Sequence, residues 1–449
     1  MAPRGAAAAL VLLILWPLVA FGGRSAPVAI SFSLCCILFA FVRRAVPTWR
    51  GGTRPLDRVL LAIAVFCVAQ AVPLPTAAVN VLSPHAEVVR RALTLTPSAS
   101  RWTTLSIDEA STLWACVVAV GTFALFFAAR NVLAHGGLRQ TVRGISAIGL
   151  GFSALAIAQA ATAGRSIYWR FPTEYEGPLP FGPFVNRNHF ATWVIMAAPL
   201  CVGYIMTRAG APQTPRSPFV SARARVTRMA DGRMAWLAVA AVVMVAALLT
   251  SMSRSGILSL GAAVVISSRA LPGRPLRGGR WWAIGILVIA AGVAVARVDI
   301  PGLAGRFAQS GSDVENRVRI WRDTLPLVSD FWLTGSGVGS YRTAMLLYQR
   351  ADRVVQFNQA HNHYLQAVAE GGVVLLGLVL AGIRSLARAT REQLSAEASG
   401  AYWIRAGAAC GLMAVALQSV WETGLVMPAN AALAAVVAAI ASYERQQAV

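Results

Sequence analysis

The chain has 449 residues, of which 57% are hydrophobic and only 13% charged, and its formal net charge is +22. A soluble domain carries roughly twice that share of charged residues, so the composition excludes an ordinary soluble enzyme. The positive charge comes from 40 basic residues, all of them arginine. Most arginines stand in short segments between apolar runs, where they orient membrane helices. A nucleic-acid partner is therefore not expected.

Apolar runs of membrane-spanning length recur along the whole chain. A helix needs about 20 residues to cross the hydrocarbon core, and lipid forces its backbone groups to pair internally. We predict an all-α polytopic membrane protein with about twelve transmembrane helices, at 5–22, 26–42, 59–75, 109–129, 144–163, 188–207, 234–250, 256–268, 281–298, 363–383, 403–421 and 427–443. The first run is interpreted as a retained helix, because a second follows closely. The short span 256–268 is expected to start earlier or to be tilted.

The positions of the arginines test this predicted membrane topology. With the N-terminus inside, every loop predicted to be cytoplasmic is rich in arginine and poor in acids, which is what orientation by positive charge requires. The arginines of these five loops are Arg43, Arg44, Arg50, Arg54 and Arg58, then Arg130, Arg139 and Arg143, then Arg208, Arg216, Arg223, Arg225, Arg228 and Arg233, then Arg269, Arg274, Arg277 and Arg280, and finally Arg384, Arg388, Arg391 and Arg405. Both termini are thus predicted to lie inside.

Three outer segments are longer than turns: 76–108, 164–187 and 299–362. The last is a large periplasmic loop between the ninth and tenth helices, and helical spacing of apolar residues predicts that it is partly helical. We divide the single membrane domain into helices one to five (1–163), an outer loop with helices six to nine (164–298), the periplasmic loop (299–362) and helices ten to twelve (363–449). The six cysteines fall within apolar runs and are interpreted as packing residues.

Four short segments place polar or ionisable groups at the outer ends of helices. They are FGPFVNRNHFATW, with Asn186, Arg187, Asn188 and His189; SMSRSG, with Arg254; ENRVRIWRD, with Arg317, Arg319 and Arg322 around Trp321; and AHNHYLQAVAEGG, with His361, Asn362, His363 and Glu370. Two or three arginines facing one pocket suit a pyrophosphate, because the guanidinium fork binds phosphate oxygens in pairs and stays charged. A nearby histidine is suited to act as a general base.

Each candidate also has a simpler interpretation. Arg254 is equally explained as an anchor at the lipid headgroups, and Arg317, Arg319 and Arg322 as a solvated helix face. His361 is explained as a capping or packing residue. A carboxylate within an apolar span, such as Glu370, is costly and usually has a partner or a role.

A glycine-rich run, GSGVGS at 335–340, looks like a phosphate-cradling loop. No predicted strand precedes it, and nucleotides are scarce outside the membrane. We interpret it as a turn, and more weakly as a backbone anion nest.

The order NRNHFA, SRSG, RVRIW, GSGVGSY and AHNHYLQ, followed by E-G-G, resembles the O-antigen ligase and O-antigen polymerase family of membrane glycosyltransferases. The resemblance runs from about residue 180 to 430, whereas the first 170 residues share only their hydrophobic helices. The chain departs from the family where SRSG replaces a form with two glycines, and where FW stands in place of a proline before the GxG turn. Neither departure removes a proposed functional group.

The resemblance implies a reaction: metal-independent, inverting transfer of a glycan from undecaprenyl pyrophosphate to an acceptor hydroxyl at the periplasmic face. The acceptor is lipid A–core for a ligase and another lipid-linked repeat unit for a polymerase, and we lean slightly towards the polymerase. The resemblance also assigns residues: Arg254 and Arg317 to the diphosphate and His361 to the base. Asn362 or Glu370 would orient the histidine, while Arg187, His189 and Arg319 are weaker candidates for the substrate site.

Two interpretations from other classes stay open. A transporter of lipid-linked sugar or a small anion usually has its ionisable groups near the midplane, whereas here they cluster at the outer boundary. A non-catalytic scaffold in a polysaccharide-assembly complex would not need His361. No cofactor is expected, since the histidines and carboxylates form no plausible metal set. The bilayer and polysaccharide-assembly proteins are the other expected partners.

Overall fold

The computed structural model describes residues 3–47, 52–93, 101–162, 165–173, 179–209, 232–270, 310–351, 356–397 and 400–444. Within these ranges eleven helices coincide with predicted spans: α1 (Pro3–Val19), α2 (Ala26–Val42), α3 (Arg54–Ala71), α6 (Glu109–Val132), α7 (Leu138–Thr162), α8 (Arg187–Ala209), α10 (Gly232–Thr250), α11 (Arg254–Ala270), α16 (His363–Ala396), α17 (Tyr402–Gln418) and α18 (Pro428–Ser442). The ninth predicted span, 281–298, lies outside the described residues, so twelve spans stay a prediction.

Among the described residues, three segments are long and apolar enough to cross a membrane: Glu109–Thr162, Arg187–Arg208 and His363–Ala396. The first joins α6 and α7 through the bent segment Leu133–Gly137. Four shorter apolar helices accompany them, at Arg4–Val19, Ala26–Val42, Met234–Thr250 and Pro428–Ser442. The chain is therefore an all-helical membrane protein in its described part, apart from two pairs of two-residue strands.

The remaining elements lie in the segments between the long helices. They are the 3₁₀ turns η1 (Phe21–Gly23) and η3 (Gly424–Val426), the helices α4 (Thr76–Leu82), α5 (Ala86–Leu93), α14 (Ser310–Asp330) and α15 (Tyr341–Tyr348), and the antiparallel pairs β1 (Leu74–Pro75) with β2 (Trp102–Thr103) and β3 (Ser166–Ile167) with β4 (Phe171–Pro172). The helices α14 and α15 lie where the sequence pattern predicts helices, whereas the periplasmic position of this segment stays a prediction. The segment 76–108 is not a plain loop, because it contains α4 and α5.

Several predicted helix ends were wrong by a few residues or more. α3 begins at Arg54, where Pro55 suits the first turn of a helix. α11 begins at Arg254, which supplies the earlier start expected for the short span. α16 continues to Ala396, far beyond residue 383. These extensions carry polar residues, so hydropathy alone does not mark them.

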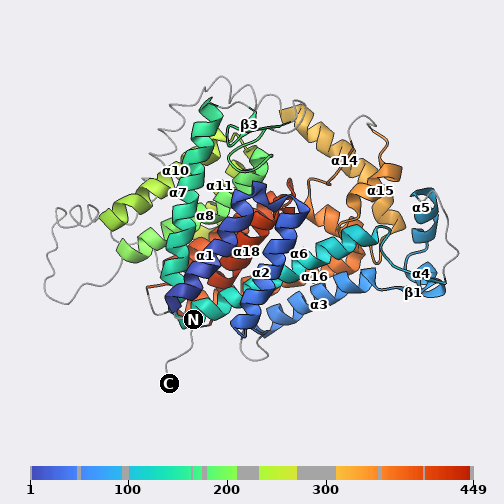
Figure 1. Cartoon of the computed structure of the whole chain (residues 1–449), viewed down its shortest axis with the longest axis horizontal. Helices are drawn as coiled ribbons and strands as arrows, with labels where there is room; N and C mark the ends of the chain where they lie inside the picture. The colour runs from blue at the N-terminus through green and yellow to red at the C-terminus, as the bar shows by residue number, and fades with distance from the viewer. Residues whose placement is uncertain are drawn as a thin grey trace.

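The C-terminal helix α18 lies at the centre of the bundle, in contact with α1, α6 and α17 (Figure 1). Its sequence is rich in alanine, and most of its residues are buried. Small side chains allow helices to approach closely, which is the main source of packing energy between helices in lipid. The helix starts at Pro428, whose missing N–H costs nothing at a first-turn position.

The helices α8 and α17 cross in close contact at glycine residues. A Cβ atom at Gly203 would lie 2.1 Å from the Trp403 carbonyl oxygen, and one at Gly407 would lie 2.3 Å from that of Pro199. These contacts hold the two helices together along their length. The start of α8 consequently lies beside the end of α17, where Thr192 contacts Gln418. Polar residues from both of these ends meet in the candidate site.

The helix ends of the bundle fall into two groups. At one end, which we call the arginine end, Arg130 near the end of α6 pairs with Asp57 at the start of α3. Arg405 at the start of α17 binds Glu397 after α16 (2.9 Å) and the Tyr443 carbonyl after α18 (3.0 Å). The opposite end, where α8, α11, α16 and α18 begin, we call the site end.

The helix α16 is interrupted at Gly372, where φ is +62°. The segment 331–340 fills this interruption: backbone N–H groups of Ser336 and Gly337 donate to carbonyls of the turn just before it, at 3.0 and 2.9 Å. A broken helix at membrane depth requires such replacement partners for its backbone.

The same segment encloses the side chain of Glu370. Its carboxylate accepts the Tyr341 N–H (3.3 Å) and the Gln366 side-chain N–H (3.1 Å). Gln70 of α3 completes the packing, because its amide donates to the carbonyls of Thr334 (2.7 Å) and Glu370 (2.9 Å). The glycine-rich run thus packs against the broken turn of α16, and the backbone N–H of Tyr341, directly after the run, donates to the carboxylate of Glu370.

Gly335 is the position where this arrangement tolerates no side chain. Its φ is +73°, and a Cβ atom there would lie 2.1 Å from the Glu370 backbone. We expect Gly335→Ala to destabilise the protein by about 2 kcal/mol or more. Thermal unfolding of the purified protein measures this. Gly377→Ala on α16 is the matched control, since nothing lies within 4 Å of its Cβ position; equal midpoints for the two variants would contradict the packing described.

Candidate functional site

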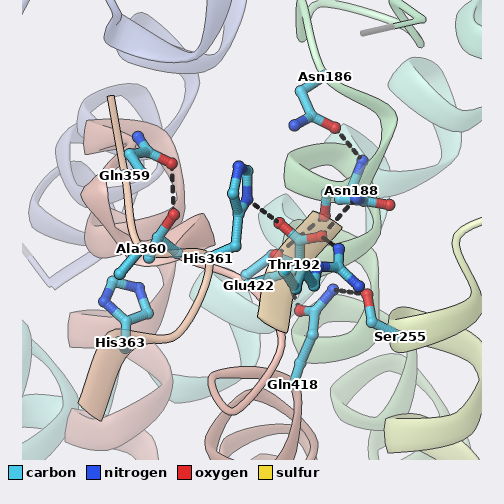
Figure 2. Close-up of polar contacts among 12 residues, drawn as sticks. Asn186, Asn188, Thr192, Ser255, Gln359, Ala360, His361, His363, Gln418 and Glu422 are labelled. Atoms are coloured by element: carbon cyan, nitrogen blue, oxygen red, sulfur yellow. Dashed lines mark hydrogen bonds and ion pairs between the residues drawn. The ribbon is translucent and has the colours of Figure 1, made fainter. Parts of the chain in front are cut away.

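Polar side chains from five segments meet at the site end (Figure 2). The segments are the start of α8, the turn before α11, the start of α14, residues 359–363 and the loop after α17. The residues that meet are Asn186, Asn188, Thr192, Ser253, Ser255, Arg317, Gln359, His361, Gln418 and Glu422. Four of these segments are the four that sequence analysis singled out. The fifth, which carries Glu422, was missed.

Glu422 is the centre of the site. Its side chain is 1% exposed, and Oε1 accepts from the Arg317 guanidinium and from Asn188 Nδ2 (2.5 Å). Its other oxygen, Oε2, lies 3.6 Å from His361 Nδ1. Among the described residues neither Oε2 nor Nδ1 has a hydrogen-bond partner within normal distance. The two atoms therefore face each other as the available acceptor and donor.

The side chain of Asn188 connects Glu422 to the turn before α11. Ser253 Oγ donates to Asn188 Oδ1 at 2.8 Å, which directs the amide N–H₂ of Asn188 towards the carboxylate. Asn186 Oδ1 accepts the backbone N–H of Asn188 at 2.9 Å. The two segments NRNH and SMSRSG thus act together in positioning one carboxylate.

A second set of hydrogen bonds lies next to the contacts of Glu422. Thr192 Oγ1 donates to Gln418 Oε1 (2.8 Å), and Gln418 Nε2 reaches Ser255 Oγ (3.4 Å). These contacts join α8, α17 and α11 beneath Glu422. They hold the loop after α17 in place without touching His361.

His361 has a backbone conformation that most residues avoid. Its φ is +49°, in the left-handed region, where residues other than glycine are uncommon and the surrounding structure has to impose the conformation. The imidazole is 34% exposed and points towards Glu422 (Figure 2). Strain of this kind at a half-exposed histidine indicates a functional position.

Asn362 and His363 serve the local structure. Asn362 Oδ1 caps α16 by accepting the backbone N–H groups of Tyr364 and Leu365, each at 3.0 Å. His363 Nε2 accepts the Leu425 N–H at 3.0 Å, and its ring lies on the other side of the segment from His361 (Figure 2). The carboxylate beside His361 is Glu422, and the proposed orientation by Asn362 or Glu370 is not what the geometry shows.

The three arginines of α14 have different surroundings. Arg317 is 21% exposed and pairs with Glu422. Arg319 lies 4.0 Å from Glu315 with both side chains solvent-exposed, and Arg322 is exposed as well. The structure therefore brings only Arg317 into the site, and the other two form a solvated helix face.

Two of the other predicted residues, Arg254 and Arg187, are direct neighbours in sequence of residues that form the site, whereas Glu370 lies away from it. Arg254 and Arg187 are half-buried first residues of α11 and α8, next to Ser253 and Asn188 respectively. His189 is buried, and its Nε2 has no hydrogen-bond partner among the described residues. Glu370 lies within the broken part of α16, bound to the 335–341 segment.

The electrostatics keep Glu422 ionised. Burial alone would raise the pKa of this carboxyl, but the His361 imidazole and the Arg317 guanidinium outweigh burial and hold the pKa below its ordinary value of 4.5. A negative charge is thereby fixed beside the histidine at any working pH.

This depressed pKa predicts a pH dependence of stability. A carboxyl whose pKa is lower in the folded state adds stability that is complete above its unfolded pKa and is lost as the pH falls through the folded one. We expect Glu422→Gln to lower the thermal midpoint near neutral pH, and the gap to the wild type to narrow as the pH falls below the ordinary carboxyl pKa of 4.5. Thermal unfolding in detergent across this range measures it; a gap independent of pH would contradict the assignment.

The fold and the site together define a class: a helical membrane protein with an arginine, a histidine and a carboxylate assembled where several helices begin. Residues 239–380 match the family model described as O-antigen ligase. The match covers about a third of the chain and confirms the resemblance to the O-antigen ligase family over this segment. Arg254, Arg317 and His361 lie within the matched segment, whereas Asn188 and Glu422 lie outside it. No curated protein matches the chain.

Proposed function

We propose that the protein is an inner-membrane glycosyltransferase that moves a glycan from undecaprenyl pyrophosphate to a sugar hydroxyl at the periplasmic face. The observation that carries this proposal is the contact set Arg317–Glu422–His361, within a chain that has an O-antigen ligase family segment. The set combines a phosphate-binding cation, a proton acceptor and a fixed negative charge.

The diphosphate of the donor binds the arginines of the site. A guanidinium has five N–H donors, and Arg317 directs one of them to Glu422 while its side chain is still partly exposed. The remaining donors suit phosphate oxygens. Arg254 lies between Ser253 and Ser255, which both contact site residues, and we assign it to the same diphosphate. Arg187 and His189 line the donor side.

His361 accepts the proton of the attacking hydroxyl. The acceptor oxygen forms a bond to C1 of the donor sugar as the bond from C1 to the phosphate oxygen breaks. The electron pair leaves with undecaprenyl pyrophosphate, and the arginines stabilise its new charge. Glu422 stabilises the imidazolium and holds the ring, the role that a buried carboxylate has beside a catalytic histidine. Attack opposite the leaving group inverts the configuration at C1.

The position of the arginines supports a periplasmic site. Arg43, Arg130 and Arg405 lie at the arginine end, opposite the candidate site. Positively charged loops stay in the cytoplasm, so the site end faces the periplasm. Lipid-linked glycans presented there would supply both the donor and a polymerase's acceptor.

The acceptor distinguishes a polymerase from a ligase, and we prefer the polymerase slightly. Purified protein would be mixed with the lipid-linked oligosaccharide of the source bacterium, with and without its lipid A–core. A ladder of longer lipid-linked chains from the donor alone supports the polymerase, while product only with lipid A–core supports the ligase. No product in either mixture would overturn the proposal.

The same assay includes a chelator. No group of three or more His, Cys, Asp or Glu side chains within the described ranges could hold a metal ion, and the proposed chemistry uses only arginine charge. Product formation is therefore expected to be unchanged in excess EDTA. A loss that added magnesium restores would contradict metal-independent transfer.

One observation favours a transporter as the alternative. The interrupted α16 with the buried Glu370 resembles the discontinuous helices on which transporters bind their substrates. However, the Glu370 carboxylate already accepts N–H groups of this chain, so substrate binding there would have to break these contacts. A transporter would move lipid-linked glycan across a vesicle membrane without changing its covalent structure.

A further inference from the structure

Two tryptophans lie against each other beside the candidate site. The ring centroids of Trp321 and Trp421 are 5.6 Å apart, with the planes inclined by 36°. Trp421 immediately precedes Glu422. Trp321 stands one helical turn after Arg317, which puts both on the same face of α14. The pair is therefore attached to the same backbone segments as the reactive groups.

The pair is anchored on one side and open on the other. Trp321 Nε1 donates to the Ala360 carbonyl at 2.9 Å, directly before His361. Trp421 is 38% exposed. Trp421 therefore presents a large aromatic surface to solvent, next to a polar cluster, and the anchored Trp321 holds it in place. Ligand-binding surfaces combine these features.

We infer that Trp421, supported by Trp321, forms a stacking surface for the sugar ring that carries the attacking hydroxyl. One face of a pyranose ring presents C–H groups, which pack on an aromatic ring, while its hydroxyls stay free for polar partners. A ring stacked on Trp421 has Glu422 and His361 beside it. The anchored partner Trp321 holds the residue before the base, so the surface and the base are positioned together. This inference rests on the proposed glycosyl transfer.

An exposed tryptophan at a membrane boundary also serves as a headgroup anchor. Trp332 provides the matched control, because it lies just after α14, is 56% exposed and takes no part in the site. If headgroup anchoring explained Trp421, both tryptophans would respond alike to substitution.

The test compares wild type, Trp421→Leu, Trp421→Phe and Trp332→Leu in transfer from the source bacterium's lipid-linked oligosaccharide. Losing the stacking surface in Trp421→Leu is expected to raise the KM for the acceptor roughly three- to ten-fold, with kcat changed less than about two-fold. Trp421→Phe should raise the acceptor KM less than Trp421→Leu does, and Trp332→Leu should leave the acceptor KM unchanged. An unchanged acceptor KM in Trp421→Leu, an equal rise in Trp332→Leu, or a rise confined to the donor KM would overturn the inference.

A binding measurement separates this inference from the proposed function. The oligosaccharide released from its lipid is added to wild type and to Trp421→Leu, and tryptophan fluorescence is compared. Saturable quenching present in wild type and absent in the variant supports the stacking surface even when no transfer is detected. Identical quenching curves for the two proteins would overturn it.

Discussion

A His361→Asn protein is expected to fold like the wild type and to transfer glycan about 10²–10⁴-fold more slowly, which is the usual contribution of a general base. Asparagine is among the residues that tolerate a positive φ, so the strained backbone at residue 361 (φ +49°) is preserved. The amide cannot accept the proton of the attacking hydroxyl. Initial rates of transfer at saturating donor measure the effect.

His85→Asn is the control for this substitution. His85 is 52% exposed and lies against Asp330, away from the site. Its replacement should leave the rate unchanged. A His361→Asn protein that retained most of the wild-type activity would remove His361 from the mechanism, whatever its folding.

Arg317→Ala is expected to lower kcat by about 10²–10³-fold, the range seen when one preorganised donor to a developing charge is removed. The loss should exceed any change in KM, since the charge on the leaving diphosphate develops in the transition state. Arg317→Lys should recover only part of the rate, because an ammonium keeps the charge and loses the paired geometry. Arg322→Ala, at an exposed position of the same helix, is the control.

Arg317 also neutralises the buried Glu422, so its loss could act through stability alone. The double variant Arg317→Ala/Glu422→Gln separates the two effects, since no unpaired buried charge is left. We expect the double variant to unfold at a higher temperature than Arg317→Ala and to be no more active. Recovery of activity together with stability would assign Arg317 a structural role only.

The fold was largely predictable because hydropathy and arginine placement act over long stretches of chain. Eleven predicted spans coincide with helices. The interruption of α16 was not predictable from the same signals, although Gly371 and Gly372 stood within the predicted tenth span. A break at one glycine depends on replacement partners from residues 331–340, which lie outside that helix.

The candidate site was predictable in part. Polar motifs at helix ends identified His361, Arg317 and Asn188, and the structure brings these together around Glu422. Glu422 itself carried a usable signal, because it is a carboxylate directly after an apolar span at the predicted outer side. It was missed because it belongs to none of the four motifs, and because Glu370 offered a carboxylate closer in sequence to His361.

The sequence also could not show which arginine of α14 belongs to the site. Arg317 and Arg319 are two residues apart, and sequence spacing placed both as candidates. Helix rotation directs the first to Glu422 and the second to solvent. Which face of the helix meets the site depends on how α14 packs against residues 360 and 421, and no local pattern contains that information.

The central claim is that the protein breaks and forms a glycosidic bond, and one measurement tests it most directly. Purified protein in vesicles is supplied with the lipid-linked oligosaccharide of the source bacterium, and all lipids and glycans are analysed by mass spectrometry. We predict that undecaprenyl pyrophosphate and glycan-extended acceptor form in equal amounts with wild type and not with His361→Asn. Lipid-linked oligosaccharide recovered unchanged but moved to the other leaflet would contradict the enzyme and establish a transporter.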